Sequence, residues 1–305
     1  ERLFAYMMAE LLTPITGIKP GWGILTGVRP VKLFHRRLDR GMSIEETAKE
    51  FRERFLVSDR KIDLALRTAA LEGPILKETN WNEYSLYISI PFCPSRCSYC
   101  SFTSHAIEKA AKLIPQYVDL LCEELRDTAV LMDELGLHLE TVYMGGGTPT
   151  VLTPEQMDRV LSTARSSFDF SGVRELTVEA GRPDTITPEK LEVMKKNGVD
   201  RISINPQTMD DGVLELIGRK HTAKDVVDAF YMARSFGFDN INMDLISGLP
   251  GDDFEKFCRT IDSVLELDPE NITLHTLTVK RSANLAGDAQ KMLSRTVDEM
   301  NEHAF

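Results

Sequence analysis

Three features are scarce in this sequence of 305 residues, and each scarcity excludes a class of protein. No apolar run reaches the roughly 18 residues that span a bilayer, so we expect no transmembrane helix. Basic residues number 36 against 47 acidic ones, and the net charge of −11 argues against a nucleic-acid partner. The five cysteines are too few and too unevenly spaced for a secreted disulfide framework. We therefore expect a cytoplasmic protein.

The first residues, ERLFAYMMAELL, lack the basic region and the small-residue cleavage site of a signal peptide, so we expect a helix there. The sequence does not begin with Met, and we expect it to be part of a longer chain. Residues 1–80 form the first expected domain, a helical region. Ser43 and Glu46 fit a capping box, in which each side chain bonds the other's backbone amide. Apolar residues follow at helical spacing, namely Ile44, Ala48, Phe51 and Phe55.

Two further segments of this region stand out. GIKPGWGILTGVRP is rich in Gly and Pro and predicts a loop between helices. VKLFHRRLDR is basic, and it fits either a solvated helix face or an anion site.

From residue 84 onward, short β-branched runs alternate with amphipathic ones. The expected strands are 85–90, 140–144, 175–180, 201–205, 241–246 and 271–277. The expected helices are 113–135, 154–168, 188–197, 223–237, 252–267 and 288–303. Helix starts are expected at Thr153, at Thr187 and near Asp252. Six β-then-α units predict an α/β fold with a parallel sheet, either open and doubly wound or a full or partial β/α barrel.

Polar or glycine-rich features follow or end all six expected strands. Because parallel strands end on the same side of a sheet, these features are expected to meet at one site. They are the cysteine cluster, GGGTPT at 145–150, Glu179, the Asn205–Gln207 segment, Asp244 before SGLPG, and His275 with Thr276.

The cysteine cluster, CPSRCSYC, places Cys93, Cys97 and Cys100 within eight residues. Thiolates at short spacing bind zinc or an iron–sulfur cluster. A zinc ion could take His105 as its fourth ligand and would then be structural. A 4Fe-4S cluster would keep one iron without a protein ligand, and so open to a bound molecule. Cys122 and Cys258 lie in expected helices and are interpreted as core residues.

The glycines of GGGTPT allow a close backbone approach to a ligand and positive φ angles. The spacing is neither the dinucleotide fingerprint nor a P-loop. Glu179 and Asp244 stand in apolar strands, where a charge needs a partner: a ligand amine, a ribose, or a basic side chain inside the barrel. Arg219 could bind a carboxylate, or could be a surface residue. His221 and His275 fit structural roles.

These motifs together resemble a known family. The Cys-x3-Cys-x2-Cys spacing with Tyr99, followed by GGGTPT, is similar to the signature of radical S-adenosylmethionine (SAM) enzymes. YISIPFCPSRCSYCSF, RISINPQTM, GRKHT and NMDLISGLPG resemble the branch of the oxygen-independent coproporphyrinogen III oxidases. GILTGVRPVKL, EAGRPD and NPQTM resemble most the coproporphyrinogen dehydrogenase paralogues of Gram-positive bacteria.

The resemblance implies a partial, six-unit β/α barrel over 81–280, followed by an incomplete C-terminal region over 281–305. It implies a 4Fe-4S cluster on Cys93, Cys97 and Cys100, with SAM bound to the open iron. SAM-binding positions, for one SAM molecule or two, are then Tyr87, Tyr99, Gly145, Gly146, Gly147, Thr148, Glu179, Gln207, Arg219 and Asp244.

The implied chemistry is hydrogen abstraction by a 5′-deoxyadenosyl radical. Its implied substrate is coproporphyrinogen III, whose propionates become vinyl groups in haem biosynthesis, with a donor such as flavodoxin or ferredoxin supplying electrons. Haem trafficking without oxidase activity is an alternative. Another radical reaction (methyl transfer, cyclopropanation or haem ring opening) and a zinc-stabilised α/β protein also stay open. The sequence departs from well-known members at Phe102, where they have a further Cys, and at Glu179-Ala-Gly-Arg-Pro-Asp, where many read ENP or DP.

Overall fold

The computed structural model describes residues 2–27, 29–102, 104–278 and 294–304. The chain divides into two compact units, Glu1–Trp81 and Asn82–Phe305. We describe each unit by itself.

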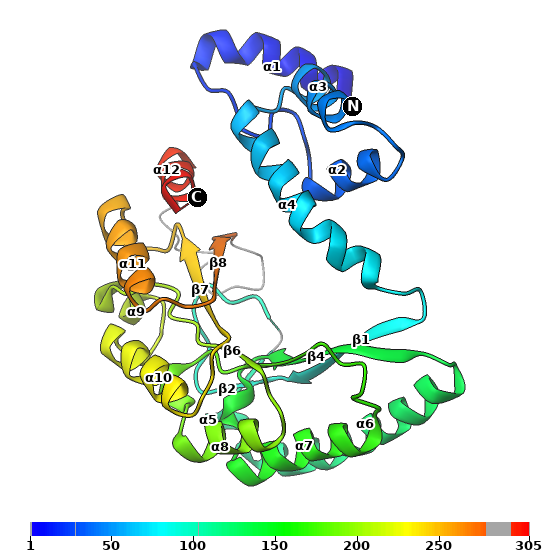
Figure 1. Cartoon of the computed structure of the whole chain (residues 1–305). Coiled ribbons are helices and arrows are strands. Elements are labelled where there is room, and N and C mark those ends of the chain that lie inside the picture. The colour runs from blue at the N-terminus through cyan, green and yellow to red at the C-terminus, as the bar shows by residue number, and fades with distance from the viewer. Residues whose placement is uncertain (1, 28, 103, 279–293, 305) are drawn as a thin grey trace. The chain divides into compact units, whose positions relative to one another are not determined.

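The first unit contains four helices: α1 (Arg2–Thr16), α2 (Val31–Leu38), α3 (Ile44–Phe55) and α4 (Asp59–Glu78) (Figure 1). The predicted capping box starts α3, with both reciprocal bonds between Ser43 and Glu46 present. Phe51 stacks between Phe34 and Phe55 in the small core of this unit. On the predicted apolar face of α3, Phe51 and Phe55 are buried and Ala48 is half-buried, whereas Ile44 is exposed.

The second unit is built on a sheet of six parallel strands in sequence order, as predicted. No pairing joins the first strand to the last in the part of the chain that the structure describes, so the sheet is open rather than a closed barrel. Its strands are β1 (Glu83–Ile90), β4 (His138–Gly146), β5 (Glu175–Glu179), β6 (Arg201–Ser203), β7 (Ile241–Ser247) and β8 (Asn271–Thr276).

Helices connect these strands and cover one face of the sheet (Figure 1). They are α6 (Ile114–Glu134), α7 (Pro154–Ser167), α8 (Pro188–Lys196), α10 (Ala223–Ser235) and α11 (Phe254–Glu266). Thr153 and Thr187 cap α7 and α8 as predicted, and Asp253 caps α11, in the region where a helix start was predicted. Cys122 is fully buried as predicted, whereas Cys258 is only partly covered and is not a core residue.

The strands alternate between an apolar outer face and a polar inner face, because successive side chains point to opposite sides. Val142, Val178 and Met243 are buried in the core beneath the helices. Their neighbours Tyr143 and Asp244 line a cavity on the other face. The site therefore occupies the sheet face that the helices leave uncovered.

Short elements that the sequence did not predict complete this unit: β2 (Phe92–Cys93), β3 (His105–Ala106), α5 (Ile107–Ala110) and α9 (Asp211–Leu216). The last helix, α12 (Ser294–Ala304), packs against β7, β8 and α11. The predicted stretch 288–293 lies outside the described residues.

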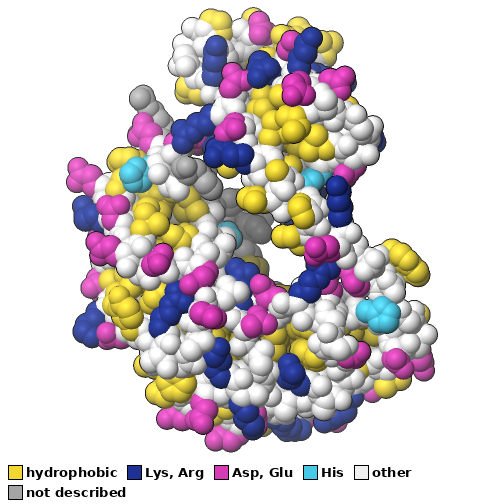
Figure 2. Space-filling model, viewed as in Figure 1, with side chains coloured by type: hydrophobic (Ala, Val, Ile, Leu, Met, Phe, Trp, Pro, Cys, Tyr) yellow, Lys and Arg dark blue, Asp and Glu magenta, His cyan; other side chains and the backbone are white. Residues whose placement is uncertain are grey.

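Within the described ranges, no helix combines the length and the apolar character needed to cross a bilayer. Figure 2 shows acidic and basic side chains intermixed on the visible surface of the second unit.

Candidate functional site

A cavity of about 480 Å³ lies at the C-terminal ends of the strands. It brings together side chains or backbone from loops and strands that are up to 188 residues apart, from Tyr87 to His275. Twelve of the thirteen predicted site residues line it: Tyr87, Cys93, Cys97, Tyr99, Cys100, Gly146, Gly147, Thr148, Glu179, Gln207, Arg219 and Asp244. Gly145 lies directly behind, where a Cβ would stand 2.7 Å from a Glu179 carboxylate oxygen.

The cysteine loop is held at both ends and in the middle. β2 and β3 pair with each other, and the His105 amide donates to the Pro91 carbonyl at 2.9 Å. In the middle, the Ser98 amide donates to the Ile217 carbonyl at 3.0 Å. The Thr148 hydroxyl donates to the Cys93 sulfur at 3.6 Å, which ties the loop to the end of β4. The fold therefore fixes where the three thiols lie.

His105, the alternative zinc ligand, is exposed on β3 and does not line the cavity. No three His, Cys, Asp or Glu side chains among the described residues are arranged to hold one metal ion. A 4Fe-4S cluster requires no such convergence, because each thiolate binds a different iron.

The three glycines at the end of β4, Gly145 to Gly147, serve the packing of the loop. A Cβ on Gly147 would lie 2.5 Å from the Phe92 carbonyl oxygen, which is closer than real Cβ atoms approach. Gly146 has φ +107°, which is open to glycine. The glycines thus allow the end of β4 to lie against the backbone that carries Cys93, in addition to any approach to a ligand.

A chain of hydrogen bonds connects the acids of the inner face. Asn205 donates to Glu179 at 3.5 Å, and Asn242 donates to Asp244 at 2.8 Å. Ser203 joins the two amides, since it donates to Asn205 and accepts from Asn242. Burial, together with the nearby Asp244 charge, raises the pKa of Glu179 to about 7. The two carboxylates therefore form an acceptor pair that a cationic or hydroxyl-bearing ligand would stabilise.

Arg219 is a buried residue and not a surface one. One terminal nitrogen donates to the carbonyls of Gly181 and Asn205, both at 3.0 Å, and the other donates to the Tyr99 hydroxyl at 3.1 Å. Its Nε has no hydrogen-bond partner among the described residues. Burial raises the pKa of Tyr99 to about 12, although Arg219 opposes that rise.

Gln207 is held in an unusual backbone conformation, with φ +71°. The backbone amide of Gln207 donates to the backbone carbonyl of Asp244 at 2.9 Å. The backbone carbonyl of Gln207 accepts from the backbone amide of Ile246 at 3.0 Å. Left-handed backbone is costly for a residue with a Cβ and persists only where neighbouring contacts impose it. The bridge to β7 is that constraint, and it directs Gln207 to the cavity.

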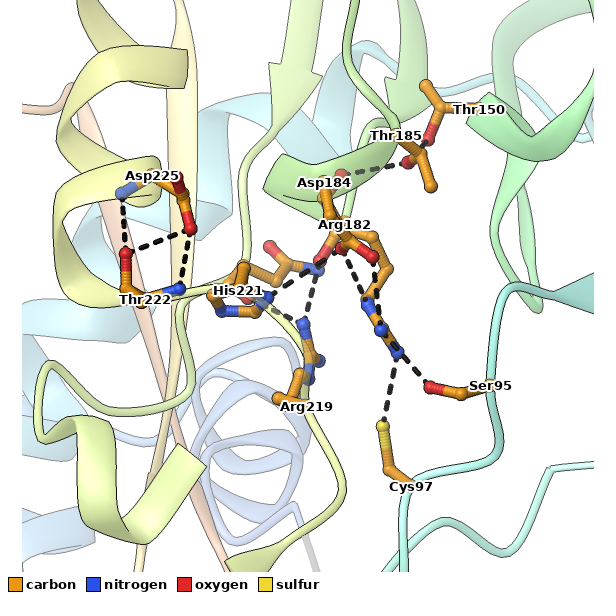
Figure 3. Close-up of polar contacts among 12 residues, drawn as sticks. Ser95, Cys97, Thr150, Arg182, Asp184, Thr185, Arg219, His221, Thr222 and Asp225 are labelled. Atoms are coloured by element: carbon orange, nitrogen blue, oxygen red, sulfur yellow. Dashed lines mark hydrogen bonds and ion pairs between the residues drawn. The ribbon is translucent and has the colours of Figure 1, made fainter. Parts of the chain in front are cut away.

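Among the residues of this site that sequence reasoning missed are Tyr143 and Arg182. Tyr143 stacks on Tyr87, with ring centroids 5.7 Å apart. Tyr143 stands two residues before Gly145 in the same strand, so both lie on the same face of the sheet. That spacing was the sequence signal that could have identified Tyr143 as a site residue. Arg182 lies in the EAGRPD segment and contacts the cysteine loop from β5's far end (Figure 3).

His221, which the sequence analysis interpreted as structural, is buried near Arg182 and Asp184. Its Nδ1 lies 3.8 Å from an Asp184 carboxylate oxygen, which is ion-pair distance rather than a hydrogen bond. Burial works against ionisation of Asp184, but His221 and Arg182 hold the pKa of that carboxyl below its usual value. His275 also lines the cavity, 4.0 Å from Asp244.

Comparison with known proteins defines the class. Residues 87–264 match the Radical SAM superfamily, and this chain belongs to that superfamily. The family predicted from the motifs is thereby confirmed, and with it a 4Fe-4S cluster and SAM as the cofactors.

Within the superfamily, the chain is similar to proteins of the coproporphyrinogen oxidase branch. It is 41% identical over 296 residues to the oxygen-independent coproporphyrinogen-III oxidase-like protein HemZ of Bacillus subtilis, which covers 95% of this chain and 59% of that protein. It is 39% identical over 200 residues to the heme chaperone HemW of Bacillus subtilis, which covers 64% of this chain and 51% of that protein. The chain thus spans between half and three fifths of the length of these relatives.

The structure is also similar to a solved member of the branch. Coproporphyrinogen III oxidase (HemN) from Escherichia coli, described as a radical SAM enzyme, superposes with a TM-score of 0.64 at 27% identity, over 72% of this chain and 50% of that one. The donor set suits the implied cofactors, because three thiols and two carboxylates border one cavity and a Cβ on Gly145 would crowd the Glu179 carboxylate in its wall.

Proposed function

We propose that this chain carries the radical SAM centre of an oxygen-independent coproporphyrinogen III dehydrogenase. The observation that carries the proposal is the extent of the HemZ match, which at 95% of the chain includes both structural units. The HemW match covers 64%. The first unit of this chain therefore has a counterpart in the oxidase-like relative.

In this proposal, Cys93, Cys97 and Cys100 hold the cluster and leave one iron open to SAM. When bound, the cluster would supply one electron for the cleavage of SAM, and the resulting 5′-deoxyadenosyl radical would remove a hydrogen atom from the substrate. Each propionate would lose that hydrogen atom, one molecule of carbon dioxide and one further electron, which an acceptor must take. Two propionates would require two molecules of SAM.

The other residues of the cavity bind and orient. Glu179 and Asp244 offer carboxylate oxygens to the ribose hydroxyls or the ammonium group of SAM. Arg219 supplies a buried positive charge near its carboxylate and holds Tyr99 in place. Tyr87 and the backbone of Gly145, Gly146, Gly147 and Thr148 form the wall that excludes water from the reacting atoms. Gln207 is expected to contact the adenosine portion.

The test is anaerobic reconstitution with iron and sulfide, followed by incubation with SAM, a reductant and coproporphyrinogen III. The expected product is protoporphyrinogen, with release of 5′-deoxyadenosine and carbon dioxide. Cys97→Ser is expected to abolish cluster assembly, whereas Cys258→Ser on α11 is the matched control that keeps it. Cleavage of SAM without loss of carbon dioxide would refute the dehydrogenase proposal.

The HemW relatives, whose name describes heme chaperones, favour haem binding as a second candidate. A retained Soret band after titration with haemin and desalting, without oxidase activity, would support it. An unchanged spectrum would count against it.

A further inference from the structure

Arg182 makes the most direct contact between the β5–α8 loop and the cysteine loop (Figure 3). One terminal nitrogen donates to the Cys97 sulfur at 3.6 Å. The other terminal nitrogen donates to the Ser95 hydroxyl at 3.2 Å. The guanidinium group is thus hydrogen-bonded to two residues of the CPSRC segment, Ser95 and Cys97.

An adjacent edge of the guanidinium, which shares the nitrogen bonded to Ser95, is paired with an acid. Nε donates to one oxygen of Asp184 at 3.1 Å, and the second terminal nitrogen reaches the other oxygen at 3.4 Å. Such a two-point contact between planar groups fixes the orientation of Arg182 as well as its position. Ser95 is itself held, since its hydroxyl donates to the Gly218 carbonyl at 3.3 Å.

The backbone of Arg182 is equally constrained. The amide and the hydroxyl of Thr185 both donate to its carbonyl, at 2.9 and 2.8 Å. The side chain retains only 4% exposure, against 25% for Asp184. The ion pair with Asp184 offsets the cost of burying this positive charge, and a negative charge on the Cys97 sulfur would offset it further.

We propose that Arg182 is a positioning residue that sets the reduction potential of the cluster by donating a hydrogen bond to the Cys97 sulfur. Asp184 and Ser95 aim the guanidinium at that sulfur. The inference rests on the proposed role of Cys97 as a cluster ligand.

The direction of the effect follows from charge. Reduction adds one negative charge to the cluster and its thiolates. A positive group and an N–H donor close to one thiolate stabilise the reduced state more than the oxidised one, so the midpoint potential is raised. Asp184 offsets part of this charge, but it pairs with Nε and the second terminal nitrogen, so the first terminal nitrogen still faces the sulfur.

The experiment is an EPR-monitored redox titration of the reconstituted cluster in the wild type, Arg182→Met and Arg182→Lys. Arg182→Met is expected to shift the midpoint potential to a more negative value. Arg182→Lys keeps the charge but cannot contact Cys97, Ser95 and Asp184 together, so its potential is expected between those two. The matched control is Arg234→Met, which breaks another bidentate arginine–carboxylate pair, with Glu270, at the start of β7 and is expected to leave the potential unchanged.

The readout is independent of catalysis and of the extent of loading, because the potential is measured on the fraction that carries the cluster. ENDOR of the reduced cluster adds a second signature: an exchangeable proton coupling present in the wild type and lost in Arg182→Met. A midpoint potential in Arg182→Met and Arg182→Lys equal to that of the wild type would overturn the inference. Cluster assembly in Cys97→Ala at the wild-type iron content would instead refute the proposed ligand set, so the two failures are distinguishable.

Discussion

At the scale of single residues, the cavity concentrates groups that are unfavourable in the free protein. Glu179 is an acid next to a second acid, and Gln207 has a left-handed backbone. Arg219 keeps a buried nitrogen without a hydrogen-bond partner among the described residues. Such features are tolerated where the surrounding structure imposes them, and they are typical of sites that a ligand completes.

Glu179→Gln is expected to stabilise the protein without SAM above pH 7. Since the folded-state pKa of about 7 exceeds the usual 4.5, the folded state binds the proton more tightly than the unfolded state does. Wild-type stability therefore falls as pH rises from about 4.5 through 7, by roughly 3 kcal/mol in total. Glutamine carries no such penalty, so the gain should vanish below pH 4.5. Urea unfolding across this range measures it.

The control for that change is Glu189→Gln, at the exposed start of α8. It should show no gain in stability at high pH. An equal gain in both variants would show that loss of net charge, and not burial of Glu179, is responsible.

Gln207→Gly is expected to be more stable than Gln207→Ala, by about 1 kcal/mol, because glycine adopts positive φ without the Cβ penalty. The pair shares the loss of the side chain, so their difference isolates the backbone. At the exposed helical position Gln116 in α6 the order should reverse, with alanine more stable. Denaturant midpoints of the four variants check both signs. Equal midpoints at position 207 would contradict the strained backbone.

At the scale of elements, the site depends on how β4 meets β2. Glycines at 145–147 allow the two backbones to touch, and Thr148 bonds the Cys93 sulfur. β2 and β3 then pair to close the base of the cysteine loop. The cluster motif and the glycine motif are therefore two halves of one packing arrangement.

Gly147→Ala is expected to disturb this arrangement. The new Cβ would meet the Phe92 carbonyl at 2.5 Å and must push β2 away, at a cost of about 1–3 kcal/mol. Cys93 would move with β2, so the iron content after reconstitution should fall. Gly172→Ala is the control, because its Cβ would be 3.7 Å from the nearest atom, the Leu139 carbonyl oxygen. Equal iron content in the two variants would refute the role of Gly147.

The long elements of this fold were predictable from the sequence, and the short ones were not. Periodicity and caps such as Thr153 and Thr187 indicated the main helices and six strands. β2, β3 and α9 have two, two and six residues, too few to show a period. Their pairing and placement arise from contacts far along the chain, such as that between Ser98 and Ile217.

At the scale of the whole molecule, the two compact units have separate hydrophobic cores. Phe34, Phe51 and Phe55 belong to the core of the first unit, whereas the second unit has the core between the sheet and its helices and a smaller cluster that contains Leu214 and Leu249. All the predicted site residues belong to the second unit, Asn82–Phe305. We therefore expect that unfolding the first unit would not abolish cluster binding by the second unit.

Phe51→Ala tests this division. Removing a fully buried ring should destabilise the first unit by about 3–5 kcal/mol. Hydrogen exchange with mass spectrometry should show lost protection over residues 31–78, and retained protection over 114–278. Leu71→Ala, at a position 76% exposed in the same unit, should change neither. Loss of protection across both units would mean that they unfold together.

The sequence by itself determined the class of this protein. The spacing of Cys93, Cys97 and Cys100, the GGGTPT motif and the alternation of six strands with helices are local patterns, and local patterns are readable along the chain. Only the tertiary structure decided that Arg219 is buried against Tyr99 and that Arg182 faces Cys97. It also decided that the glycines accommodate Phe92. These contacts join residues 55 to 120 positions apart, and no sequence period encodes which side chain meets which when strands gather at one edge of a sheet.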